Sequence, residues 1–304
     1  MKRKILSSVL AVSVLSSTFG AEPTPESKSQ YTLFNPTPSE SMRAWRTDHA
    51  GVSPYTIDAG HFEVDLTPLE YGYDEHDIII AGGNALVVFT RLQIRSEAWR
   101  YGALAAKVGL ANWLDAEVAF VPYQTITSEP EHVVRDDSGR PVIRRTTRSG
   151  FSDIVSRLKL NIWGNDGGTT ALSVSGNVKF PTASDDLGNG QFEGGPSVEF
   201  AAQIPWGFEL RINGAANLYE DDRDNRQAAV GSLLSLSHQI VGNLQGYALF
   251  DATAFTSGDD WIGSVKAGLI YRITKDIELY IGNSFGVTDD AFDYEPFIGV
   301  AARF

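Results

Sequence analysis

Three things are scarce in this sequence: cysteine, long apolar runs and basic charge. Cysteine is absent, so no disulfide holds the fold together. After residue 20, no stretch reaches the roughly 18 uninterrupted apolar residues that a membrane-spanning helix needs. Lysine and arginine number 25 against 38 aspartates and glutamates, and a net charge of −13 argues against nucleic acid as a partner. Spanning helices are therefore excluded, and a closed hydrogen-bonded barrel is one way to hold such a chain without disulfides.

The first twenty residues have the three-part layout of a secretory signal peptide. Three basic residues at positions 2–4 precede an apolar stretch over 5–15, and small residues follow. We expect cleavage after Gly20, because Thr18 then occupies the small-residue position two before it. The expected organisation is a signal peptide (1–20), an N-terminal periplasmic segment or plug (21–59) and a transmembrane β-barrel (60–304).

From residue 60 onward, apolar and polar residues alternate in segments of about ten, separated by clusters of Gly, Asn, Asp and Pro. In the segment 150–163, for example, leucine and isoleucine fall on one face, and Arg157 and Lys159 fall on the other. No segment has a convincing helical stripe. The pattern predicts twelve strands, at 60–73, 98–110, 113–124, 150–163, 169–181, 194–204, 208–219, 227–240, 244–255, 261–273, 277–286 and 294–304.

The connections between these strands alternate in length, as the periplasmic turns and outer loops of membrane barrels do. Short ones follow residues 110, 163, 204, 240 and 273, and longer charged ones include 125–149 and 182–193. The stretch 74–97 is open to either interpretation, as a loop or as further strand. Tryptophan placement agrees with the same asymmetry. Trp113, Trp163 and Trp206 lie beside short turns, and Trp99 and Trp261 lie at the opposite end, which indicates two aromatic girdles rather than ordinary core tryptophans.

Soluble β-sandwiches also alternate, but they do not place charge opposite nearly every apolar residue. In a membrane barrel the charged face lines a wet lumen, where both signs neutralise each other at little desolvation cost. We therefore predict an all-β protein, a transmembrane antiparallel β-barrel of the bacterial outer membrane. The predicted lumen-lining residues are Glu63, Lys107, Glu117, Asp153, Arg157, Lys159, Glu199, Glu209, Arg211, Asp251, Lys266 and Glu278.

Several sequence segments resemble the outer-membrane transporter family named for the meta-pathway of phenol degradation. They are WRTD at 45–48, SPYTIDAGHFE at 53–63, KVGLANWLDAE at 107–117, the strand and GNDGG turn over 150–168, KFPT at 179–182 and GNG at 188–190. The resemblance implies a barrel that admits small, partly apolar compounds, aromatics among them, without fixing the solute. The chain departs from the family pattern in the apolar stretch 77–94 and the basic loop 140–148.

The chain ends in Phe304, on the same face as Val300 and Ile298. A terminal aromatic residue that closes an amphipathic strand resembles the signal read by the barrel-assembly machinery of outer membranes. We therefore expect that machinery as a partner, together with outer-membrane lipid and lipopolysaccharide.

The sequence offers no catalytic set and no metal site. Of five histidines, only His238 lies within a strand on the apolar face. Outer-membrane phospholipases place His and Ser two residues apart on that face, but Leu236 and Ile240 stand at those positions here. The acidic clusters in the loops lack the spacing of a calcium loop. We predict neither an enzyme nor a bound cofactor.

Two segments have open roles. The basic run of a long outer loop either folds inward as an anion-selective constriction or stays exposed, and its candidates are Arg140, Arg144, Arg145 and Arg148. Residues 21–59 are either a flexible periplasmic tail or a plug, in which case the region from Arg43 to Asp48 would meet luminal charges. The predicted function is passive diffusion of small solutes through the lumen. The alternative is a structural or adhesive barrel sealed by salt bridges.

Overall fold

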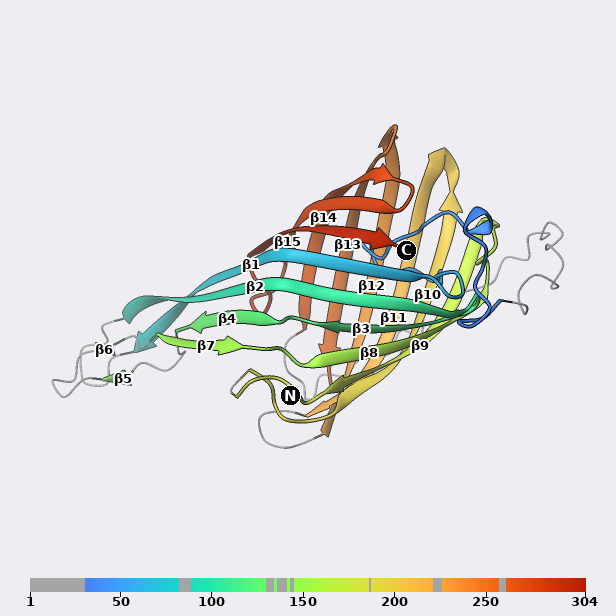
Figure 1. Ribbon diagram of the computed structural model, residues 1–304. Helices are drawn as coiled ribbons and strands as arrows, with labels where there is room; N and C mark the ends of the chain where they lie inside the picture. Colours follow the sequence, from blue (N-terminus) through green and yellow to red (C-terminus); the bar gives the residue numbers. More distant parts are fainter. Residues whose placement is uncertain are drawn as a thin grey trace, which may run out of the picture.

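The computed structural model describes residues 31–81, 89–129, 134–135, 141–142, 145–185, 187–220, 226–256 and 261–304 (Figure 1). The strands are β1 (Phe62–Ala81), β2 (Phe89–Ala111), β3 (Leu114–Phe120), β4 (Tyr123–Ser128), β5 (Val134–Arg135), β6 (Pro141–Val142), β7 (Thr146–Gly150), β8 (Ile154–Trp163), β9 (Thr170–Phe180), β10 (Glu193–Ile204), β11 (Phe208–Glu220), β12 (Arg226–Val241), β13 (Leu244–Phe255), β14 (Ile262–Thr274), β15 (Ile277–Gly286) and β16 (Tyr294–Arg303). The signal peptide predicted at 1–20 lies outside the described residues.

The barrel has twelve antiparallel strand positions. β3 and β4 together fill one position, since both pair with β2. β7 and β8 fill the next position, where β7 pairs with β4 and β8 pairs with β3. The order then runs from β8 through β9 to β16, β16 pairs with β1, and β1 pairs with β2, which closes the ring. The predicted all-β barrel of about twelve strands is confirmed.

The barrel is apolar outside and polar inside, as the alternation predicts. On β8, Leu158 is 51% exposed, whereas its neighbour Lys159 is 1% exposed. A lysine buried next to an exposed leucine is unfavourable in a soluble protein, because burial of an ammonium group is costly and exposed leucine gains nothing from water. The arrangement is favourable when lipid surrounds the outer face.

The first two strands continue through the stretch that the sequence leaves open. β1 has 20 residues and β2 has 23, about twice the length of a membrane-crossing β-strand. Together with β4 and β7 they extend well past the other strands of the barrel, toward the left of Figure 1. The predicted loop 125–149 is correspondingly too long, because β4 continues to Ser128 and β7 begins at Thr146.

Aromatic residues gather where this extension begins, at the end of the pairing between β1 and β16. A chain of ring contacts with centroids 4.3 to 6.3 Å apart links Tyr73, Tyr294, Tyr71, Trp99, Tyr101 and Tyr123. At the other end, Trp113, Trp163 and Trp206 are 39%, 39% and 87% exposed beside their short turns. Rings with one polar atom favour the boundary between headgroups and hydrocarbon, so these two bands mark the height of the membrane.

Helical structure is minor in the described part of the chain. The helical turns η2 (Ser39–Ser41) and η3 (Pro205–Gly207) have three residues each. Among the described residues, no helix has the length and apolar character needed to span a membrane.

Candidate functional site

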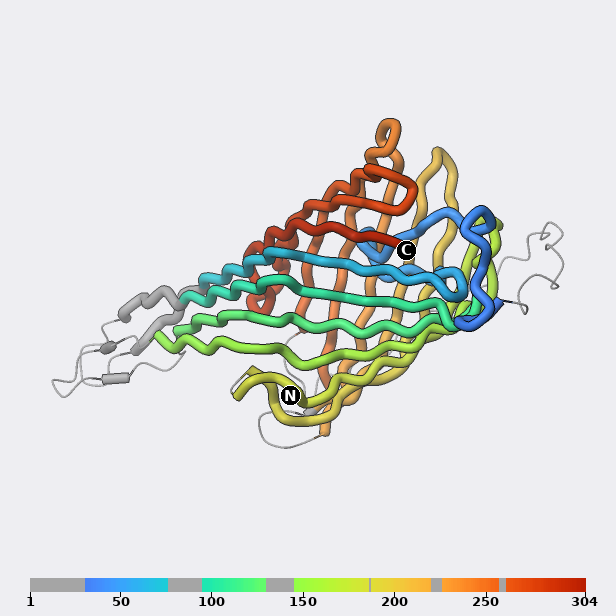
Figure 2. The backbone as a smooth tube through the Cα atoms, in the orientation of Figure 1, coloured from blue at the N-terminus to red at the C-terminus, as the bar shows by residue number. Residues whose placement is uncertain are grey.

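Residues 31–61, which we call the plug, run from the short-turn end of the barrel into its lumen, as the blue tube in Figure 2 shows. The plug is tied to the rim at both ends. The Leu33 amide donates to the Leu110 carbonyl at 2.9 Å, and the His61 ring contacts the carbonyls of Phe304 and Thr37 at 3.0 and 2.8 Å. These contacts fix where the plug enters.

The turn between β2 and β3 holds several parts of the plug through one residue. The Asn112 side-chain oxygen accepts hydrogen bonds from the Thr37 hydroxyl and the Ala59 amide, each at 2.8 Å. Its carbonyl accepts from Arg43 Nη1 at 3.0 Å and from the Thr56 hydroxyl at 2.9 Å. Because these groups are buried or partly buried, each satisfied polar atom stabilises the docked plug.

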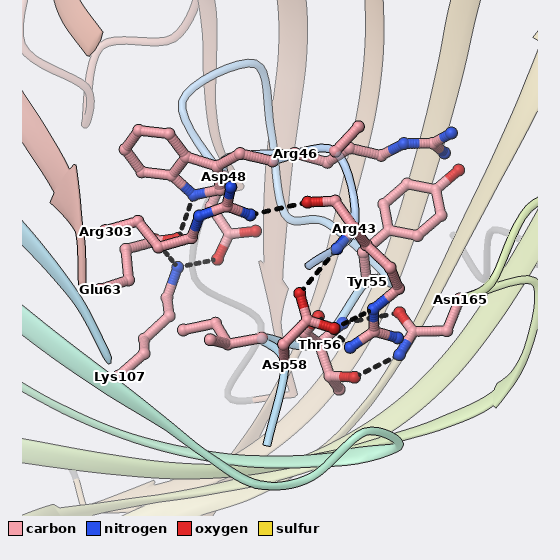
Figure 3. A pocket seen from close by; sticks show the side chains of 13 residues that line it. Arg43, Arg46, Asp48, Tyr55, Thr56, Asp58, Glu63, Lys107, Asn165 and Arg303 are labelled. Atoms are coloured by element: carbon pink, nitrogen blue, oxygen red, sulfur yellow. Dashed lines mark hydrogen bonds and ion pairs between the residues drawn. The ribbon is translucent and has the colours of Figure 1, made fainter. Parts of the chain in front are cut away.

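Arg43 organises the fold of the plug itself. Its Nε donates to Asp58 at 2.6 Å, and its carbonyl accepts a hydrogen bond from Arg303 Nη1 at 2.8 Å (Figure 3). The first contact closes the plug into a loop, and the second attaches that loop to the last strand.

One side of the lumen is a charged wall, formed by Glu63 on β1, Lys107 on β2, Glu117 on β3, and Arg157 and Lys159 on β8. Asp48 of the plug lies among the cations of this wall. Its carboxylate is 2.9 Å from Lys107 Nζ, 3.0 Å from Arg157 Nη2 and 3.9 Å from Lys159 Nζ. Lys107 also contacts Glu63 at 2.8 Å, so the plug carboxylate completes a network of both signs.

The protonation of Asp48 follows from this network. Burial alone raises the pKa of the Asp48 carboxyl, but the positive charges of Lys107, Lys159 and Arg157 hold that pKa well below its usual value. Asp48 is therefore a carboxylate at neutral pH. A second plug residue, Trp45, joins the network through a hydrogen bond from its indole nitrogen to Glu63.

Side chains on the opposite side of the lumen bind backbone carbonyl groups of the plug. Arg211 Nη1 on β11 donates to the carbonyls of Thr47 and Gly51 at 2.7 and 2.9 Å. The Ser235 hydroxyl on β12 donates to the Ala50 carbonyl. Residues 47–51 therefore cross the lumen and contact both of its sides. We call residues 49 and 50 the plug tip.

Behind the plug tip lies a surface that we call the apolar wall. Its inward-facing residues come from five neighbouring strands: Leu233, Tyr247, Leu249, Ile270, Tyr280 and Phe297. Ala50, 1% exposed, packs into this group.

Glycines on the neighbouring strands make room for the rings of Tyr280 and Phe297. A Cβ at Gly299 would lie 2.1 Å from the Tyr280 hydroxyl, and one at Gly282 would lie 2.5 Å from Phe297. These glycines give the rings room to pack on the strands.

His49, next to Ala50, stacks on the apolar wall. Its ring lies 3.8 Å from that of Tyr280 at an interplanar angle of 26°, and its Nδ1 is 3.3 Å from a carboxylate oxygen of Asp65. Burial, with the positive charge of Lys107 beside it, lowers the pKa of His49 to about 3. The imidazole is therefore neutral at pH 7.

The docked plug leaves polar space beside it. A cavity of about 220 Å³ lies between the plug and β11 to β14, and one of about 180 Å³ lies nearer the short turns. Both are lined by Glu209, Gln245, Ile270 and Arg272. Each has room for several water molecules. Polar space thus remains beside the docked segment.

The twelve predicted lumen-lining residues separate into groups. Five form the charged wall. Glu209 pairs with Arg211 at 2.7 Å, Glu278 pairs with Arg272, and Glu199 accepts hydrogen bonds from three serines. Asp153 lies 3.2 Å from Lys179 near the outer loops, Asp251 accepts from the Ser264 hydroxyl at 2.6 Å, and Lys266 lies over the Phe297 ring at 5.2 Å.

Two of the four basic loop candidates fall within the described residues. Arg140 and Arg144 lie outside the described residues. Arg148 lies on β7, and Arg145 immediately precedes that strand. Arg145 pairs with Glu129 at 3.5 Å, and its side chain is 52% exposed. His238 stacks on Phe208 at 4.5 Å. Within the described residues, no group of three or more acidic or histidine side chains is placed to hold a metal ion.

The sequence indicated the region 43–48 as the part of a plug that would meet luminal charges, and Asp48 does so. It did not identify His49 and Ala50 as contacts, nor the apolar wall itself. A signal for the wall was present, however. The alternation that places Asp251, Lys266 and Glu278 inward also places Leu249, Ile270 and Tyr280 inward. For His49 and Ala50 no such signal exists, because the plug has no regular alternation of apolar and polar residues.

Comparisons with known proteins agree with this architecture. The model of the family described as "Putative MetA-pathway of phenol degradation" matches residues 50–304. An outer-membrane channel from Pseudomonas putida F1 is similar in structure, with a TM-score of 0.53 and 10% identity, over 86% of this chain and 100% of that one.

Two further solved structures have lower scores. The NanC porin has a TM-score of 0.46 and 13% identity over 79% of this chain and 98% of its own. The toluene transporter TbuX of Ralstonia pickettii has a TM-score of 0.42 and 9% identity over 80% and 89%. No curated protein matches the sequence significantly. The fold and the family match establish a porin-like β-barrel of the bacterial outer membrane.

Proposed function

This chain belongs to the family described as "Putative MetA-pathway of phenol degradation", and we propose that it is a passive outer-membrane channel for small, partly apolar solutes, aromatics among them. In this proposal, the lumen is the route and the plug closes it at rest. No bond is made or broken, and the lumen-lining side chains select by size, charge and apolar contact.

The observation that carries this proposal is the apolar wall inside an otherwise polar lumen. Lumens that pass only hydrophilic solutes have no need of six apolar side chains on one inner face. Tyr247, Leu249, Ile270 and Tyr280 are each 7% exposed or less, and Ala50 of the plug belongs to the same buried cluster, so plug release would expose the part of this surface that Ala50 covers. An apolar surface with few polar groups at its edge is the usual form of a site for small organic molecules.

The experiment is planar-bilayer conductance and liposome uptake with the refolded protein, with and without residues 21–59. We expect small, infrequent currents from the full chain, because only the polar cavities beside the plug admit ions. Removal of the segment is expected to give large steady currents and uptake of benzyl alcohol. Silence and no uptake in both forms would overturn the channel.

A sealed structural barrel is the second candidate, favoured by the network around Asp48, which ties the plug to two strands. Arg157→Ala separates the two functions. Arg157 lies 3.0 Å from Asp48 and also contacts Glu117. In a channel, its loss changes conductance or ion preference. In a sealed barrel, it lowers the unfolding temperature and gives no specific flux.

A further inference from the structure

The tip of the plug has the chemistry of a small ligand. His49 is a planar ring stacked on Tyr280 at 3.8 Å, its Nδ1 faces Asp65 at 3.3 Å, and the neighbouring Ala50 methyl packs among Tyr247, Leu249 and Ile270. A ring, an apolar substituent and one polar atom at the ring edge thus contact three different kinds of group on the wall.

Beside the apolar wall, the groups that face His49 are arranged to accept a hydrogen bond. The Tyr280 hydroxyl donates to Asp65 Oδ1 at 2.5 Å, and it lies 2.6 Å from the Thr67 hydroxyl. Because Tyr280 already uses Oδ1, the second oxygen of Asp65 faces the lumen, where His49 Nδ1 lies. A carboxylate accepts only, so it selects an N–H or an O–H at that point.

His49 is an imperfect occupant of this position. Its Nε2 is buried and has no hydrogen-bond partner among the described residues, and an unsatisfied buried polar atom destabilises the docked state. The plug does not depend on His49 for its attachment, since Asp48, Arg211 and Asn112 all hold it through several contacts. A ring without a second polar atom would fit the same position without this cost.

From these contacts we infer that His49 and Ala50 occupy the solute site, so that solute and plug tip compete for one position on the apolar wall. The inference rests on the proposed channel function and adds the site and its ligand chemistry. The favoured solute is a planar ring of about benzene size with one hydroxyl or N–H donor at its edge. Since only one occupant fits, a bound solute shifts the plug toward its released state.

The test uses the full chain with Thr47→Cys as a reporter. Thr47 lies next to the plug tip and is 6% exposed, and the natural sequence has no cysteine, so maleimide reacts with one thiol only. The rate of labelling then measures release of the plug. The probes are 4-methylphenol and 4-methylanisole, which share the ring and its 4-methyl group; the anisole has a methyl ether in place of the O–H donor.

We expect 4-methylphenol to accelerate labelling at least fivefold and 4-methylanisole to do so clearly less. In the background of His49→Ala, the concentration of 4-methylphenol needed for half of the effect should fall severalfold, because the internal competitor is gone. Asp65→Asn should remove the difference between the two probes. Asp289→Asn, which changes an exposed loop carboxylate, should leave that difference intact.

If Asp65→Asn does not fold, Tyr280→Phe serves in its place, since it keeps the ring and removes the hydroxyl that orients Asp65. Uptake of both probes into liposomes with unchanged labelling would overturn the inference and leave the channel standing. Equal acceleration by the two probes would overturn the assigned role of Asp65. Absence of uptake by any form, the chain without residues 21–59 included, would overturn the channel itself.

Discussion

The two sides of the lumen bind the plug through different interactions, ion pairs on one side and apolar contacts on the other. On the charged wall, a single carboxylate, Asp48, contacts Lys107 and Arg157 within 3.0 Å. On the apolar wall, Ala50 and His49 make nonpolar and stacking contacts with Tyr280 and its neighbours. An ion pair in a partly buried place is sensitive to the loss of one partner, whereas an apolar contact changes gradually with the area that it covers.

This difference assigns separate roles to the two walls: the charged wall attaches the plug, and the apolar wall recognises the solute. Charges that are fixed by several partners at once keep the plug in register, because a small displacement breaks all of the contacts together. The apolar wall has less directional preference, so another apolar group can replace the plug tip there. In this account the charged wall determines whether the lumen is closed, and the apolar wall determines which solute opens or crosses it.

The largest effect is expected from Asp48→Asn. The change removes the plug carboxylate from Lys107 and Arg157, which keep Glu63 and Glu117 as partners, and removal of one partner of a buried pair costs about 3–5 kcal/mol. Because 21% of the Asp48 side chain is exposed, we expect about 3 kcal/mol, or roughly a hundredfold shift toward the released plug. Open probability in planar bilayers measures it.

The matched control is Asp166→Asn. Asp166 lies 3.5 Å from Arg43 of the plug but at an exposed pair, where the loss should be below about 1 kcal/mol. If the two variants open the channel equally, the charged wall does not hold the plug.

A second, smaller effect concerns pH. His49 has a pKa of about 3 when docked, and an ordinary value near 6.5 is expected in water once released. The released state therefore binds the proton first, so docking is strongest above pH 6.5 and weakens as the pH falls through 6.5 toward 3. At pH 5 the loss amounts to about 2 kcal/mol. Open probability should rise between pH 7 and pH 5.

His49→Gln provides the control for this pH dependence, since glutamine does not titrate and keeps a polar side chain of similar size. The groups facing His49 are Asp48, Asp65, Tyr280, Lys107 and Arg211. A pH response that is unchanged in His49→Gln would assign it to one of them instead.

The smallest effect is on solute preference. Leu249→Asn places an amide on the apolar wall, where Leu249 is 7% exposed beneath the plug. In the chain without residues 21–59, uptake of benzyl alcohol relative to glycerol should fall severalfold, since apolar contact of one side chain contributes on the order of 1–2 kcal/mol. Leu249→Ile should retain the wild-type ratio, and an equal ratio in all three forms would mean that this wall does not sort solutes.

Much of the barrel was predictable because its information is local. A strand with one face toward lipid repeats every two residues, and that repeat fixed each of the predicted strands to within a few residues of β8 to β16. The extension of β1 and β2 was harder to assign, because beyond the membrane no apolar face has to be maintained. The same reason explains why the start of β7 at Thr146 fell inside a predicted loop.

The site was predictable only in part. Parity along β14 and β15 assigns Lys266 and Glu278 to the inner face, but the expectation of a wet lumen drew attention to charged residues and away from Ile270 and Tyr280. Contacts of the plug join residues far apart in the chain, such as Asp48 with Arg157. No sequence period records such contacts, so only the structure could supply them.

The central claim, that the plug closes the lumen and must move for solutes to pass, is tested most directly by a reversible lock. A Cβ placed on Gly51 would lie 3.0 Å from the Cβ of Ser235, so Gly51→Cys and Ser235→Cys can form a disulfide once the backbone shifts by a few tenths of an ångström. Because Gly51 has a φ of +98°, a cysteine there is strained, and the reduced double variant is therefore the reference for the oxidised one. Since no other cysteine is present, this bridge is unique. We predict that oxidation of the double variant abolishes benzyl alcohol uptake and large currents and that a reductant restores both, while neither single variant responds. Equal uptake and current in the oxidised and reduced double variant would contradict the account.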